Sequence, residues 1–220
     1  MSDKGFQPYA VMLDLSGRLA VIVGSGAKSL RIVRTLLAHG AEVLIVAPDP
    51  IDELIEMEKA GELALETRPY RRGDLDGALL AFAMSGSMRI DDAVAQEARE
   101  CGVLVNVQGD AAVSDFIVPS LVSRGALQIA VSTGGAAPQI AREVRRGIAA
   151  TYGPEWATYT ALLSEMRVIA MERQGMSAAA TAPMIEHAMA SGLLRRLADG
   201  EVLSAAQLIA DAVRDSAPTA

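Results

Sequence analysis

A glycine-rich turn lies between a buried strand and a helix near the start of the chain. Five apolar residues, Leu19 to Val23, run directly into Gly-Ser-Gly-Ala-Lys-Ser at residues 24–29. A short apolar run that ends at glycine is typical of a strand buried on both faces, and a helical pattern follows from Leu30 to His39. In this context a Gly-x-Gly-x-x-Ser pattern predicts a dinucleotide site, whereas the pattern alone indicates only a structural turn.

The small residues of this turn have separate physical roles. Gly24 permits the sharp change of direction from strand to helix, Gly26 lets a pyrophosphate approach the backbone, and Ser29 allows close packing of helix on strand. The first N–H groups of the helix and its positive dipole end favour phosphate. Lys28 lies in the loop itself, so we expect its ammonium group to contribute to phosphate binding, although an ordinary surface lysine is the alternative.

Strands and helices alternate over the first half of the chain. After the glycine turn, the pattern predicts strands over residues 42–47, 63–68, 78–84 and 103–107, and helices over residues 51–60 and 90–101. This alternation is typical of βαβ units, so we expect an α/β fold with a Rossmann-type, doubly wound parallel sheet. Ligands bind such sheets at the carboxyl edge, where the loops after the strands lie.

The pattern changes after about residue 113. Residues 116–121 and 127–131 are strand-like and flank a turn at 123–125, which predicts a hairpin. Further helices are expected over residues 139–150, 155–174, 179–189 and 204–215, with a frayed tail at 216–220. We therefore expect three parts: a dinucleotide-binding domain (1–113), a hairpin-plus-helix region (114–150) and a C-terminal helical domain (151–220).

Composition excludes several classes of function. The net charge of −7 argues against a nucleic-acid partner, and the lack of any uncharged run of 18 residues argues against a membrane span, so we expect a cytoplasmic protein. Cys101 is the single cysteine, and we expect it to be a buried or half-buried helix residue. His39 and His187 have no partners at zinc-ligand spacing, so no metal site is expected.

Three blocks of sequence carry a family resemblance. They are VIVGSGAKSLRIVRTLLAHGAEVLIVAP (21–48), NV…DFIVPSLVSRG (106–125) and LQIAVSTGGAAPQIAREVR (127–145). In these blocks the chain resembles the precorrin-2 dehydrogenase/sirohydrochlorin ferrochelatase family, the dehydrogenase part of siroheme synthases. The resemblance implies NAD-dependent oxidation of precorrin-2 to sirohydrochlorin, followed in some members by iron insertion. It also implies a homodimer in which the hairpin and the first long helix pair across subunits.

The resemblance assigns cofactor contacts to three loops. The residues at those positions are Gly24, Ser25, Gly26, Ala27, Lys28, Pro48, Asp49, Ser85 and Gly86. Gly86 stands where the family usually has an aspartate. NAD is favoured over NADP because no arginine immediately follows the second strand.

The resemblance also points to a catalytic carboxylate near the fifth strand. The family's proposed catalytic aspartate falls on Gly109, and Asp110 follows one residue later. We expect Asp110 to take a proton or to hold the macrocycle nitrogens. The alternative is a turn residue whose carboxylate caps local N–H groups. Asp115 is a second carboxylate nearby.

A polyanionic tetrapyrrole requires basic groups in an acidic protein. Arg142, Arg145 and Arg146 share one helix face, and the preceding Gly134-Gly135 turn offers N–H groups. The alternative for these arginines is a solvated helix face. The family's phosphorylated serine corresponds to Thr133. The expected substrate-binding set is therefore Thr133, Gly134, Gly135, Arg142 and Arg146.

Three functions are consistent with this sequence. The leading one is an NAD-dependent precorrin-2 dehydrogenase of siroheme synthesis. The departures at Gly86 and Gly109 favour a second one, a catalytically impaired dimer that binds a dinucleotide or a tetrapyrrole as sensor or carrier. A different NAD(P)-dependent reductase on the same scaffold is the third.

Overall fold

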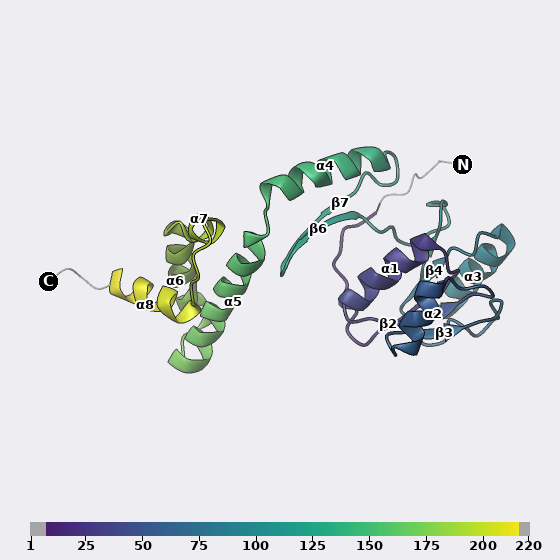
Figure 1. The fold of residues 1–220 in the computed structure, drawn as a ribbon, viewed down its shortest axis with the longest axis horizontal. Helices are drawn as coiled ribbons and strands as arrows, with labels where there is room; N and C mark the ends of the chain where they lie inside the picture. The colour runs from purple at the N-terminus through teal and green to yellow at the C-terminus, as the bar shows by residue number, and fades with distance from the viewer. Residues whose placement is uncertain (1–7, 216–220) are drawn as a thin grey trace. The chain divides into compact units, whose positions relative to one another are not determined.

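The computed structural model describes residues 8–215 of the chain (Figure 1). These residues divide between two compact units, Met1–Val118 and Pro119–Ala220. The tail expected to fray, residues 216–220, lies outside the described residues. Within residues 8–215, no helix combines the length and the apolar character that crossing a membrane requires.

The first unit is a five-stranded parallel sheet with helices on both faces (Figure 1). Its strands lie in the order β3-β2-β1-β4-β5, and each neighbouring pair is parallel. The expected doubly wound sheet is therefore confirmed. The strands are β1 (Leu19–Val23), β2 (Glu42–Val46), β3 (Ala64–Glu66), β4 (Leu80–Ala83) and β5 (Leu104–Val107), and the helices are α1 (Ala27–Ala38), α2 (Asp52–Lys59) and α3 (Met88–Cys101).

Two apolar clusters bury the two faces of this sheet. Ile22 of β1 packs in a cluster with residues of α1 and α2, whereas its neighbour Val21 packs in a second cluster with residues of α3. Because successive strand residues point to opposite faces, burial of both faces requires an uninterrupted apolar strand. This requirement explains the run of five apolar residues before the glycine turn.

Helix α1 begins earlier than its apolar pattern indicates. It starts at Ala27 rather than Leu30, and the amide of Leu30 donates to the carbonyl of Gly26 at 3.1 Å, so residues 27–29 are already helical. Ser29 is buried, as expected for the residue that packs helix against strand. Lys28 is consequently the second residue of the helix and is exposed.

The second unit begins with an antiparallel hairpin of β6 (Ser120–Arg124) and β7 (Leu127–Val131). The expected hairpin is present, but the predicted bounds of its first strand (116–121) and of its turn (123–125) were wrong. Residues 115–116 belong to the first unit, where the Asp115 amide donates to the Val105 carbonyl at 2.8 Å and Phe116 packs edge-on against Phe82. The hairpin therefore starts four residues later and turns at Gly125-Ala126.

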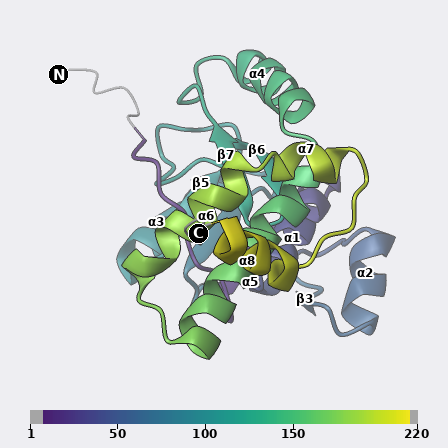
Figure 2. The ribbon, with the colours of Figure 1, turned by 90° about the vertical axis from the view of Figure 1, so that its left-hand side faces the viewer.

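Helices make up the rest of the second unit. They are α4 (Pro138–Thr151), α5 (Glu155–Gln174), α6 (Ala178–Ala190), α7 (Leu193–Ala198) and α8 (Ala205–Asp215). The sequence did not indicate α7, whose Leu193 is fully buried. Helices α5 to α8 pack together around one apolar cluster (Figures 1 and 2). Met166 and Met184 lie in this cluster, which confirms that the methionine-rich stretch serves helix packing.

Candidate functional site

Gly24 is the residue at which three loops of the first unit meet. Its amide donates to the carbonyl of Val46 at the end of β2, at 3.0 Å. Its backbone has φ +123°, and a Cβ at this position would lie 2.3 Å from the carbonyl oxygen of Met84, just beyond β4. Glycine is therefore required both by the backbone conformation and by the close approach of the β4 loop.

The N-terminus of α1 is open beside this contact. Gly26 is its N-cap with φ −81°, and a Cβ there would meet no atom within 4 Å. Within the described residues, no side chain caps this helix and no acidic residue lies in its first turn. Its first N–H groups are thus available to an anion, which is the arrangement that favours a pyrophosphate.

The loop after β2 forms one side of the phosphate loop. The Ser25 hydroxyl donates to the backbone carbonyl of Asp49 at 2.8 Å, which ties the two loops together. Pro48 and Asp49 are exposed, whereas Ala47, nearer the usual position of a ribose-binding acid, is buried. The Asp49 carboxylate is therefore the acidic group that this loop presents at the carboxyl edge.

The loop after β4 forms the other side, and a residue that the sequence analysis missed holds it. The backbone amide and the hydroxyl of Ser85 both donate to Oδ1 of Asp91, at 3.0 and 2.7 Å. Gly86 is exposed in this loop with φ +80°. An acid in the first turn of a helix was the available signal for Asp91, but a favourable helix-dipole contact explains such an acid equally well.

Asp110 lies in the exposed loop that follows β5. Its Oδ1 accepts the amide of Ala112 at 3.0 Å, so the expected alternative, a carboxylate that caps a local N–H group, is present. Its Oδ2 has no protein partner among residues 8–215, which leaves one oxygen for a ligand. Asp115 differs, because its Oδ2 accepts the Val105 amide at 3.0 Å and so serves the edge of β5.

The strand order places these groups along one edge. Ligands of open α/β sheets bind at the point where the strand order reverses, which here lies between β1 and β4. Asp49 follows β2 on one side of the phosphate loop, and Asp110 follows β5 on the other, two strands or about 10 Å from β1. A dinucleotide with its adenine ribose near Asp49 would extend its reactive end toward Asp110.

The predicted substrate-binding residues lie in the second unit. Gly134 and Gly135 have φ +61° and +87° and form the turn before α4. Ser132 Oγ accepts the Gly134 amide at 3.0 Å, and Thr133 Oγ1 accepts the Ala137 amide at 3.1 Å. Because the Gly134 amide is already bonded, this turn offers fewer N–H groups to a carboxylate than the glycine pair suggested, and among the described residues the Gly135 amide is the one of the pair without a partner.

On the basic face of α4, Arg142 and Arg146 are exposed, whereas Arg145 is half-buried. Arg142 has no ion-pair partner within residues 8–215, whereas Arg146 pairs with Glu143 at 2.9 Å. Both partners of this pair are largely exposed, so the interaction is weak and does not hold Arg146 in place.

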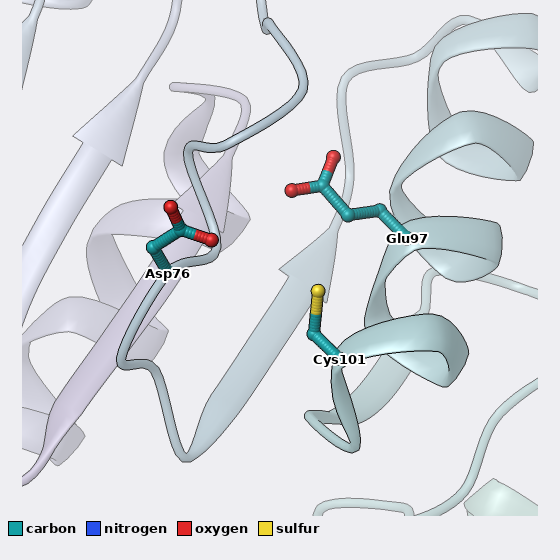
Figure 3. A group of neighbouring side chains, drawn as sticks. All are labelled: Asp76, Glu97 and Cys101. Atoms are coloured by element: carbon teal, nitrogen blue, oxygen red, sulfur yellow. The ribbon is translucent and has the colours of Figure 1, made fainter.

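A further group of side chains lies at the end of α3 far from the Ser85 loop. Ligand atoms of Asp76, Glu97 and Cys101 all lie within 4.8 Å of one another (Figure 3). The two oxygens of buried Glu97 already accept hydrogen bonds, from the Tyr70 hydroxyl at 2.5 Å and the Gly73 amide at 2.8 Å. Burial and the bond to Glu97 raise the pKa of Tyr70. These bonds fasten the 70–73 segment to α3.

Cys101 does not have the environment that the sequence predicted. It is exposed at the last residue of α3, because Gly102 adopts φ +71° and ends the helix there. Neither histidine is a member of this group. His39 caps the end of α1, where Nδ1 lies 2.7 Å from the Thr35 carbonyl oxygen, as expected for a histidine at a helix C-terminus.

Comparisons with known proteins agree with this geometry. A family model described as "Putative NAD(P)-binding" matches residues 11–120, half of the chain, and one described as "Sirohaem biosynthesis protein central" matches residues 124–151. A solved structure of "SirC, precorrin-2 dehydrogenase" superposes with a TM-score of 0.77 at 23% identity, covering 94% of this chain and 100% of that one. This likeness confirms the fold.

Two curated relatives identify the family. A siroheme synthase of Chromobacterium violaceum is 38% identical over 137 residues, which are 62% of this chain and 29% of that protein. The chain thus spans less than a third of that synthase. A precorrin-2 dehydrogenase of Priestia megaterium is 30% identical over 161 residues, which are 73% of this chain and 79% of that protein. With its NAD(P)-binding first unit, the chain therefore belongs to the precorrin-2 dehydrogenase family.

Proposed function

We propose that this protein is an NAD-dependent precorrin-2 dehydrogenase that forms sirohydrochlorin in siroheme synthesis. One observation carries the proposal: the uncapped N-terminus of α1 opens beside Gly26 at the switch point of the sheet, in a chain of this family. The oxidation removes a hydride and a proton from the substrate. The protein must therefore position a dinucleotide and offer a group that accepts or stabilises a proton.

The residues of the first unit fit NAD. The pyrophosphate would lie on the N–H groups of residues 26–28, with the ammonium group of Lys28 adding positive charge. Asp49 would accept hydrogen bonds from the adenine ribose, an arrangement that disfavours the 2′-phosphate of NADP. Ser85 and Gly86 would line the opposite side. Bound NAD supplies the hydride acceptor.

Asp110 is the proposed catalytic residue. Its Oδ1 is held by the Ala112 amide, which orients the carboxylate while Oδ2 stays available. We infer that Oδ2 accepts the departing proton or hydrogen-bonds the macrocycle nitrogens. A carboxylate fixed through one oxygen loses little conformational freedom when it engages substrate, which favours positioning.

The second unit supplies the proposed substrate contacts and the dimer contact. Arg142, Arg146 and the turn at Thr133–Gly135 would bind substrate carboxylates. On α4, Ile140 and Val144 are 58% and 45% exposed, and the two strands of the hairpin beside this helix pair with no further strand among residues 8–215. These features support a homodimer formed by the hairpin and α4, within residues 114–150. Sedimentation at micromolar concentration tests it, and a monomer would contradict it.

The test follows product and reduced cofactor together. Purified protein is mixed with precorrin-2 and NAD, and the absorbance of sirohydrochlorin and of NADH is recorded. We expect sirohydrochlorin and NADH to form in equal molar amounts. In Asp110→Ala we expect kcat to fall by about 10²-fold or more with the Kd for NAD unchanged. Absence of turnover in the wild type would overturn the proposed function.

Two backbone positions favour a second candidate function. Gly86 and Gly109 are exposed glycines with φ +80° and +85°, where the family pattern has carboxylates. A protein that binds NAD or tetrapyrrole without turnover would fit a sensor or carrier. Binding of either ligand in the absence of product formation distinguishes this candidate from the enzyme.

The cytoplasmic location and the iron insertion seen in some family members remain predictions.

A further inference from the structure

Asp91 is a buried carboxylate at the start of α3. Only 9% of its surface is exposed, although aspartate is normally a surface residue. A carboxylate is costly to bury unless hydrogen bonds satisfy it. Among residues 8–215, the hydrogen bonds that the Asp91 carboxylate accepts come from a single residue, Ser85, which lies two residues after the end of β4 and six residues before Asp91 in the chain.

The hydroxyl of Ser85 extends this interaction along the loop. A hydroxyl has one proton to donate, and the acceptor at 2.7 Å is Asp91 Oδ1, whereas the carbonyl of Ser87 lies at 3.2 Å. The same hydroxyl accepts the amide of Ser87 at 3.1 Å. Asp91 therefore orients Ser85 directly and Ser87 through the Ser85 hydroxyl.

This loop is one wall of the dinucleotide crevice. The amide of Met84 donates to the carbonyl of Val23 at 2.9 Å, and the Met84 carbonyl lies against Gly24. The residues that Asp91 holds thus continue directly from the contact with the phosphate loop. Removal of the Asp91 carboxylate would therefore leave the loop at Ser85 less ordered, without removing any group proposed to contact the cofactor.

We propose that Asp91 is a positioning residue for dinucleotide binding. It acts through Ser85, which it keeps in the conformation that the crevice requires, so that the loop need not be ordered when the dinucleotide arrives. Ordering a loop on binding lowers affinity, and a preformed loop avoids that cost. This inference rests on the proposed function, because it assumes that the crevice binds NAD.

The experiment compares three substitutions in the full chain. Asp91→Ala removes the acceptor, Asp91→Asn keeps an acceptor oxygen of the same shape, and Asp92→Ala removes the exposed neighbouring carboxylate as a matched control. We expect Asp91→Ala to raise the Kd and the KM for NAD about tenfold while the KM for precorrin-2 stays within about twofold. Asp91→Asn and Asp92→Ala should bind NAD within about threefold of the wild type.

A second variant and a second readout keep the test decisive. Asp91→Glu keeps the charge but displaces the carboxylate from Ser85 by one methylene group, and it should raise the Kd for NAD by about threefold or more, even if Asp91→Ala folds poorly. Amide hydrogen exchange over residues 84–87 should be faster in Asp91→Ala than in Asp92→Ala. Wild-type NAD affinity in a folded Asp91→Ala or Asp91→Glu variant overturns the positioning role of Asp91 and leaves the proposed function standing. Failure of the wild type to bind NAD overturns the proposed function as well.

Discussion

Gly24 and Met84 approach so closely that no side chain fits between them. A Cβ on Gly24 would lie 2.3 Å from the Met84 carbonyl oxygen and 2.7 Å from its carbonyl carbon. Both obstacles are backbone atoms, which cannot rotate away as a side chain can. The first glycine of the turn is therefore a folding requirement, whereas Gly26, with open space around its Cβ position, is not.

Gly24→Ala should destabilise the fold. The new methyl group collides with backbone, and the φ of +123° is unfavourable for any L-residue with a side chain. We expect the free energy of unfolding to fall by on the order of 3 kcal/mol, measured by urea denaturation. Gly26→Ala is the matched control, and an equal loss in both variants would contradict the distinction.

Gly26→Ala should impair binding rather than folding. Its φ of −81° suits alanine and no atom lies within 4 Å of the added Cβ, so the unfolding free energy should change by less than about 0.5 kcal/mol. The methyl group would occupy the space in which a pyrophosphate meets the helix N-terminus. We expect the Kd for NAD to rise about tenfold or more, measured by calorimetric titration. Unchanged affinity for NAD would show that the pyrophosphate does not bind at this turn.

Asp74 should contribute a pH-dependent part of the stability of the first unit. Its oxygens accept two bonds from Arg68, at 2.8 and 2.9 Å, and one from the Arg71 amide at 2.8 Å. Burial acts to raise the pKa of Asp74, but these hydrogen bonds and the Arg68 charge together lower it below its ordinary value. A lowered folded-state pKa means stability that is fully present above the unfolded pKa, about 3.9, and is lost as the pH falls through the folded value.

Asp74→Asn tests this pH dependence. The wild type should be more stable than the variant by a constant amount above about pH 5, and the difference should shrink below about pH 4 as Asp74 becomes protonated. Urea denaturation at a series of pH values measures it. The matched control is Asp92→Asn, which removes an exposed carboxylate that has no hydrogen-bond partner among residues 8–215. A difference that stays constant down to pH 3 would refute the role of the Arg68–Asp74 pair.

The sequence predicts the sheet well because its signals are local. The apolar run before Gly24 reflects burial of β1 on two faces, and each loop of the carboxyl edge follows from the alternation of strand and helix. The hairpin register fails for the opposite reason. Phe116 is a residue type that is common in strands, but its ring packs on Phe82, a contact between residues far apart in the chain.

The parts of the site that sequence reasoning missed depend on such distant contacts. Asp91 resembles any first-turn acid until Ser85 is seen to donate two bonds to it. Cys101 resembles a small helix residue until Gly102 is seen to end the helix and leave the thiol exposed. Residue type and spacing alone do not contain this information, because it arises from the packing of loops against helices.

Substitution at residues 109 and 110 tests where the proposed catalytic carboxylate lies. Asp110 follows Gly109, whose φ of +85° and open Cβ position leave space for a side chain at the cost of backbone strain, about 1 kcal/mol. Because neighbouring residues direct their side chains differently, a carboxylate at 109 should not replace one at 110. We expect the double variant Gly109→Asp/Asp110→Ala to turn over precorrin-2 as slowly as Asp110→Ala, measured as sirohydrochlorin formed per enzyme. If the double variant instead regained activity, the catalytic position would be residue 109, and Asp110 would serve only to cap the Ala112 amide.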